Sequence, residues 1–211
     1  MKITLIYDNV VYNPDLTADW GFACLVEAAG YTLLFDTGAK SNVLLGNMQQ
    51  LGIDPKRIDM VFISHNHWDH TGGLNGFLQI QPVPVFVPAS CSPPDIATEV
   101  VRVETPVEVF KDIYSTGQLG GMEQSLFIRK NGGVIVVTGC SHPGVGNIVT
   151  AASQFGPVKT VIGGLHGFSD FALIDPLETI CPAHCTQHID AIRKRYPDKY
   201  MAAGAGRILE I

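Results

Sequence analysis

His65-Asn66-His67-Trp68-Asp69-His70 places four potential metal ligands within six residues of a 211-residue chain. Imidazole and carboxylate side chains together suit zinc, iron or manganese rather than calcium. In an extended turn His65 and His67 point the same way, while Asp69 and His70 can diverge toward a second ion. The short apolar run at 60–64 predicts a buried strand, which a solvated surface turn would not need. We therefore expect a strand that ends in a site for two metal ions sharing one water.

The rest of the chain predicts a single α/β domain, residues 1–211, with antiparallel strands first and strand–helix alternation later. With 46% hydrophobic and 16% charged residues, the chain can bury one sizeable core. This order of elements fits two sheets packed face to face and flanked by helices. Ser41 is expected to cap the first helix. The expected strands span 2–7, 20–27, 31–35, 60–64, 134–137, 160–162, 179–181 and 207–211, and the expected helices span 41–51, 147–155 and 189–196.

Residues 79–118 differ from the flanking sequence because six prolines interrupt any long element. We expect an insertion or lid at about this position. Its aromatic residues Phe86, Phe110 and Tyr114 either wall a substrate pocket or pack within a surface flap.

Charge and cysteine content narrow the classes of function. The net charge of −6 disfavours binding to a nucleic-acid backbone. No N-terminal signal segment is evident, and no apolar run reaches the roughly 18 to 20 residues that cross a bilayer. Five cysteines without a C-x-x-C pair disfavour a disulfide framework or a zinc ribbon. We expect a soluble cytoplasmic protein whose partner is a small-molecule substrate, with no nucleic acid and no membrane.

The histidine stretch resembles the H-x-H-x-D-H signature of the metallo-β-lactamase superfamily. Within it, the chain is similar to a subgroup labelled as 7,8-dihydropterin-6-yl-methyl-4-(β-D-ribofuranosyl)aminobenzene 5'-phosphate synthase-like proteins, or as metal-dependent hydrolases of superfamily II. The resemblance implies a four-layer αββα sandwich and a dinuclear metal site. The segments that carry it further are Phe35-Asp36-Thr37-Gly38, Tyr7-Asp8-Asn9, Thr138-Gly139-Cys140-Ser141-His142-Pro143-Gly144, Gly163-Gly164-Leu165-His166 and Ala183-His184-Cys185-Thr186.

Two metal ions need ligands beyond the first loop. His142 is the first imidazole at a strand end after the cluster, so we expect it to join His65 and His67. The resemblance implies that His184 is the superfamily's final histidine and joins Asp69 and His70. One departure is visible, because the strand that would present a metal-bridging aspartate in many members ends here in Cys140.

Other residues near these motifs have open assignments. Asp36 is expected to orient a ligand histidine rather than bind metal, since ligating imidazoles usually donate their second N–H to a carboxylate or carbonyl. Cys140 is either a soft ligand or bridge, or a plain buried thiol. His166 is either an outer ligand or substrate contact, or a structural histidine. His188 is expected to be solvated, and Cys185 to lie in the core.

These expectations favour a hydrolase that cleaves an ester, amide, thioester or phosphoester of a small molecule. Its cofactors would be two divalent ions, with zinc as the first choice and iron or manganese as alternatives. A metal-bound hydroxide would attack the substrate, and Asp69 would accept a proton while ligating metal. The alternatives are an iron-dependent redox enzyme with the same fold and a non-catalytic metal-binding protein, because ligand types alone do not choose the metal.

Overall fold

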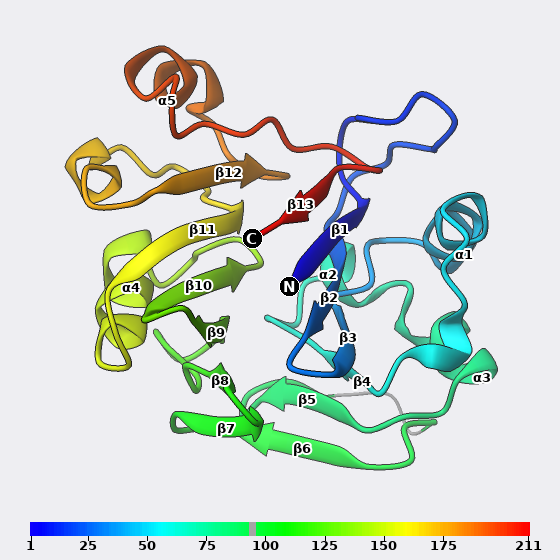
Figure 1. The fold of residues 1–211 in the computed structure, drawn as a ribbon. Coiled ribbons are helices and arrows are strands. Elements are labelled where there is room, and N and C mark those ends of the chain that lie inside the picture. The colour runs from blue at the N-terminus through cyan, green and yellow to red at the C-terminus, as the bar shows by residue number, and fades with distance from the viewer. Residues whose placement is uncertain (93–95) are drawn as a thin grey trace.

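A computed structural model describes residues 1–92 and 96–211, and its strands form two mixed sheets (Figure 1). The first sheet has seven strands in the order β13-β1-β2-β3-β4-β5-β6 and the second has six in the order β12-β11-β10-β9-β8-β7. In the first sheet these are β1 (Lys2–Tyr7), β2 (Ala23–Ala28), β3 (Tyr31–Phe35), β4 (Met60–Phe62), β5 (Val85–Pro88), β6 (Val100–Val103) and β13 (Ile208–Glu210). In the second they are β7 (Val107–Phe110), β8 (Ile113–Ser115), β9 (Leu126–Lys130), β10 (Gly133–Thr138), β11 (Val158–Gly164) and β12 (Thr179–Ala183).

Helices cover the outer face of each sheet, with α1 and α3 on one side of the molecule and α4 and α5 on the other (Figure 1). The apolar faces of these helices pack against their sheets, because an amphipathic element must bury one side. The helices are α1 (Ser41–Gln50), α2 (Trp68–Thr71), α3 (Leu74–Ile80), α4 (Val145–Ser153) and α5 (Ile189–Arg195), with short 3-10 turns at Pro55–Arg57 and Phe171–Ile174.

The alternation of side chains along each strand explains the layers. Ile3 and Leu5 of β1 belong to the cluster between the sheets, which also holds Ile135 and Val137 of β10. Ile6 of β1 belongs instead to the cluster beneath α1 and α3. Because successive residues of a strand face opposite ways, one strand supplies two cores. The expected αββα sandwich is confirmed.

The proline-rich segment 79–118 does not form a separate layer in the part of the chain that the structure describes. It supplies β5 and β6 to the edge of the first sheet and β7 and β8 to the edge of the second. Phe86 and Phe110 pack against the core between the sheets, and Tyr114 stacks on Phe127. Within the described residues, Pro82 and Pro84 precede β5, Pro88 is the last residue of β5, and Pro106 lies between β6 and β7. The loop after β5 does reach the histidine loop, where Cys91 contacts Asn66.

Several boundaries differ from the sequence expectation, among them the starts of two helices. Helix α1 begins at Ser41, but Lys40 occupies the cap position and makes no capping hydrogen bond through its side chain, so the expected Ser41 cap is wrong. Helix α4 begins at Val145, two residues before the expected start, after Gly144 with its positive φ of 93°. Among the helices of the described residues, none combines the length and apolar character that a membrane crossing requires.

Candidate metal centre

The candidate site lies where strands of both sheets end. Asp36 follows β3, the histidine loop follows β4, and Cys140 and His142 follow β10. His184 follows β12. Parallel pairing brings neighbouring strand ends to one edge of each sheet, and β3 pairs parallel to β4 while β10, β11 and β12 run parallel. Packing of the two sheets then places residues from distant parts of the chain around one space.

His65, His67 and His142 form the first group of that space. The ring centroids of His65 and His67 are 4.5 Å apart, and each lies 4.9 Å from the ring of His142. The Nε2 atom of His65 is 3.0 Å from Nδ1 of His67. The structure thus brings together the three residues that the sequence analysis grouped.

His70, His184 and Asp69 form the second group. The ring centroids of the two histidines are 5.0 Å apart. One oxygen of Asp69, Oδ2, lies 3.3 Å from Nε2 of His184 and 4.0 Å from Nε2 of His70. The rings of His65 and His70, one from each group, are only 4.1 Å apart. The two groups therefore adjoin.

Asp36 connects both groups through hydrogen bonds without facing the shared space itself. Its Oδ2 accepts hydrogen bonds from Nδ1 of His70 and from the Ser64 hydroxyl, each at 2.7 Å. The Ser64 oxygen in turn lies 2.9 Å from Nδ1 of His65. Because the Ser64 hydroxyl donates its proton to Asp36, it must accept a proton from Nδ1 of His65, and Asp36 accepts one from Nδ1 of His70. Both histidines therefore carry their proton on Nδ1. Their Nε2 lone pairs are left for the shared space.

The N-terminal segment holds the second group from outside. Asn9 accepts a hydrogen bond from Nδ1 of His184 at 3.0 Å and donates to the His184 carbonyl at 2.9 Å. The indole N–H of Trp20 donates to Oδ2 of Asp69 at 2.8 Å, and its ring packs edge-on against His184 with centroids 5.3 Å apart. Asn9 lies in a motif that the resemblance used, but neither role was predicted.

Glu123 fixes the loop that carries Cys140 and His142, although the sequence analysis did not single it out. Its fully buried carboxylate accepts backbone N–H groups of Cys140 and Ser141 at 2.9 Å and of His142 at 2.8 Å. The side chain of the next residue, Gln124, donates to the carbonyl of Ile63, and its backbone N–H donates to the carbonyl of Ser64. Glu123 and Gln124 together thus tie the ends of β4 and β10.

Burial sets the protonation of the rings. Removal from water lowers the pKa of His65, of His70 and of His142, and the neighbouring histidines lower those of His65 and His70 further. These three rings are therefore neutral at pH 7, which is the form of imidazole that binds metal.

Cys140 lies directly beside the candidate ligand His70. Its sulfur is 3.3 Å from Nε2 of His70. A hydrogen bond with the thiol of Cys185 raises the pKa of Cys140 and lowers the pKa of Cys185 to about 6. Cys185 is partly exposed rather than a core residue. His166 is exposed, and its ring centroid lies 5.0 Å from that of His142.

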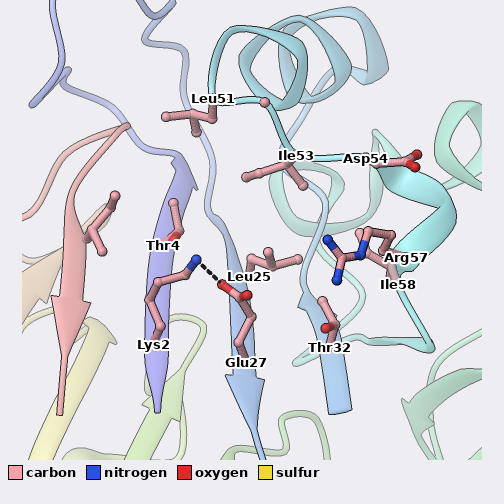
Figure 2. A pocket seen from close by; sticks show the side chains of 12 residues that line it. Lys2, Thr4, Leu25, Glu27, Thr32, Leu51, Ile53, Asp54, Arg57 and Ile58 are labelled. Atoms are coloured by element: carbon pink, nitrogen blue, oxygen red, sulfur yellow. Dashed lines mark ion pairs between the residues drawn. The ribbon is translucent and has the colours of Figure 1, made fainter. Parts of the chain in front are cut away.

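A cavity of about 610 Å³ adjoins the first group and is lined by residues of the turns after β10 and β11, including His142, Val145, His166 and Phe168. Figure 2 shows a different pocket, of about 240 Å³, at the other end of the first sheet. Strands β1 to β3 and β13 and the segment after α1 line it. An ion pair of 2.6 Å joins Lys2 of β1 to Glu27 of the neighbouring β2 along one wall. It contains no histidine or cysteine, so the first cavity is the candidate for substrate.

The donor set fits metal ions. The buried Nε2 atoms of His142 and His184 have no hydrogen-bond partner. Asn9 accepts the Nδ1 proton of His184. When that ring is neutral its Nε2 lone pair faces the Asp69 oxygen at 3.3 Å, and the two acceptors repel each other unless a cation lies between them. Nε2 of His65 and Nδ1 of His67 also approach each other, at 3.0 Å. Unpaired buried acceptors that converge are typical of a ligand site.

Together, two packed sheets between helices and a histidine-rich cluster at their strand ends define a class of αββα metalloproteins. The model of the metallo-beta-lactamase superfamily matches residues 21–184, and the chain belongs to this superfamily.

Individual relatives agree with this assignment. The chain is 26% identical to the 7,8-dihydropterin-6-methyl-4-(beta-D-ribofuranosyl)-aminobenzene-5'-phosphate synthase of Methanocaldococcus jannaschii, over 98% of this chain and 95% of that protein. Among solved structures, Tm1679, a metal-dependent hydrolase of the beta-lactamase superfamily, is 28% identical with a TM-score of 0.82, covering 100% of this chain and 99% of the other. The metallo-beta-lactamase fold protein YhfI from Bacillus subtilis, 14% identical with a TM-score of 0.74 over 100% and 99% of the two chains, shares the fold.

Proposed function

We propose that this protein is a metal-dependent hydrolase that holds two divalent ions, zinc in the first place, and cleaves an ester, amide, thioester or phosphoester of a small molecule. The observation that carries the proposal is the convergence of imidazoles from both sheets beside a cavity of about 610 Å³. Two of their buried nitrogens, Nε2 of His142 and of His184, have no hydrogen-bond partner. His65, His67 and His142 would hold one ion, and Asp69, His70 and His184 the other. Asp36 would orient His65 and His70.

The chemistry supplied by such a pair is general. Two bound ions acidify a shared water to a pKa of about 7 and polarise the oxygen of a substrate carbonyl or phosphoryl group. Asp69 brings a carboxylate beside His70 and His184, where it would accept a proton from an attacking water. His166 is exposed beside His142. It would contact the substrate rather than bind a metal ion.

The relatives support this class and suggest substrates to test. Tm1679 is described as a metal-dependent hydrolase, and the protein from Methanocaldococcus jannaschii bears the name of a synthase of a phosphorylated product. A small phosphorylated molecule therefore belongs in any substrate panel.

Protein purified without added metal is expected to carry two ions per chain in native mass spectrometry, because the candidate ligands divide into two groups. The same protein should hydrolyse at least one of a panel of small nitrophenyl esters, thioesters and phosphoesters. A chelator should abolish that activity, and zinc should restore it. Full occupancy at a single ion would contradict the two-ion site, and two iron ions with oxygen consumption would favour redox chemistry instead.

Replacing Trp20 by phenylalanine is expected to lower the affinity of the Asp69, His70 and His184 site for its ion by roughly 10-fold. Groups that orient a ligand contribute about 10- to 100-fold to metal affinity. The change removes the indole N–H that holds Asp69 and keeps an aromatic ring against His184. Competition with a chromophoric chelator measures both affinities.

Trp68→Phe is the matched control, because Trp68 is the second of only two tryptophans and its side chain is 63% exposed in the same loop as Asp69. Equal losses in the two variants would show that the Trp20 hydrogen bond does not orient Asp69.

A further inference from the structure

Cys140 occupies the point at which the two groups of the metal centre meet. Its sulfur belongs to one set of potential ligand atoms with His65 and His142 and to a second set with His70 and His184. Within each set the atoms lie within 4.8 Å of one another. Among the residues that the structure describes, Cys140 is the one present in both sets.

The sulfur of Cys140 has a polar neighbour, unlike a cysteine packed in an apolar core. Buried cysteines usually behave as small hydrophobic residues, whereas Cys140 has a nitrogen lone pair beside it. Asp36 takes the Nδ1 proton of His70, so Nε2 of His70 presents its lone pair to the sulfur at 3.3 Å. Either a thiol proton or a cation must lie between these atoms.

The backbone around Cys140 is fixed tightly enough to aim the side chain. Glu123 holds the N–H groups of residues 140 to 142. On the other side, a Cβ atom at Gly164 would come within 2.3 Å of the Gly139 carbonyl and 3.2 Å of the Cys140 Cα, so only glycine permits this approach of β11. The turn therefore has little freedom to swing the sulfur away.

We propose that the Cys140 thiolate is a ligand common to both ions, in the place where a carboxylate bridge would otherwise stand. The inference rests on the proposed two-ion function and adds the bridging atom to it. The single thiol proton passes to solvent as the first metal–sulfur bond forms, and the second ion binds another lone pair of the same sulfur, so no oxidant or reductant is needed. A sulfur ligand favours zinc, cobalt and iron(II) over magnesium and manganese.

Cobalt(II) tests the proposal directly, because a thiolate bound to cobalt absorbs in the near-ultraviolet through sulfur-to-metal charge transfer. The chain with two cobalt ions is expected to show this band. Cys140→Asp should lose the band and still bind two ions, since a carboxylate can bridge metals, whereas Cys140→Ala should bind at least one ion about 100-fold more weakly.

Cys185→Ser is the control. Its sulfur contacts the Cys140 carbonyl at 3.7 Å but belongs to neither set of ligand atoms, so the band and both ions should remain. Two cobalt ions without a sulfur band in the unmodified chain would overturn the thiolate bridge and leave the two-ion hydrolase intact. A band that survives Cys140→Asp but is lost in Cys185→Ser would assign the sulfur ligand to Cys185 instead. A chain that binds no cobalt would reject both proposals.

Discussion

Replacing Asp69 by alanine is expected to remove the ion held with His70 and His184 and to lower the rate of hydrolysis by about 10³-fold or more. Among the described residues, Asp69 supplies the one carboxylate within 4.0 Å of Nε2 of both His70 and His184. Its backbone contact with Phe22 does not involve the side chain, so the fold should be kept. Native mass spectrometry and the rate on the best panel substrate measure the two effects.

Asp36→Asn provides the contrast with Asp69→Ala. Asp36 uses one oxygen for two donors and the other for the Ser64 N–H, and an amide cannot accept all three. We expect both ions to remain but to bind roughly 10- to 100-fold more weakly. Complete loss of metal in both variants would refute the distinction between a ligand and a residue that orients ligands.

Replacing Glu123 by alanine is expected to lower the free energy of unfolding by about 3–5 kcal/mol, because it leaves three buried backbone N–H groups without an acceptor. Denaturant unfolding of the metal-free protein measures this loss. Glu178→Ala is the control, since Glu178 forms an exposed ion pair with Lys159 of the kind that contributes about 0–1 kcal/mol.

Glu123→Gln separates stability from metal binding. Oε1 of Glu123 serves Cys140 and Ser141 while Oε2 serves His142. An amide that keeps the first oxygen turns its NH2 group toward the N–H of His142. This variant should therefore be more stable than Glu123→Ala but should still bind the ion of His65, His67 and His142 more weakly. Unchanged stability in Glu123→Ala would mean that water replaces the carboxylate.

The layers and the local part of the site could be predicted because they depend on short-range patterns. Alternation in β1 and the apolar run before His65 indicated buried strands. His65 and His70 lie within six residues of sequence, so they had to be close in space. Composition did not indicate the strands β5 to β8 within residues 79–118, because prolines beside short strands hide their pattern.

The rest depends on contacts that no local pattern encodes. Glu123 reaches Cys140, Ser141 and His142 across 17, 18 and 19 residues. The sequence could not decide whether Cys140 is a soft ligand or a plain thiol. That choice depends on the packing of the sheets, because His65 and His70 come from one sheet and His142 from the other.

The division of the cluster between the two sheets has a consequence for stability. Ions held by histidines of β4 and of β10 and β12 would bind the packed molecule and not its separated layers. A ligand that binds only the folded state adds RT ln(1 + [L]/Kd), or about 4 kcal/mol at 1,000 times its Kd. The resistance of this protein to heat would then be set as much by the free metal concentration around it as by the packing of its own core.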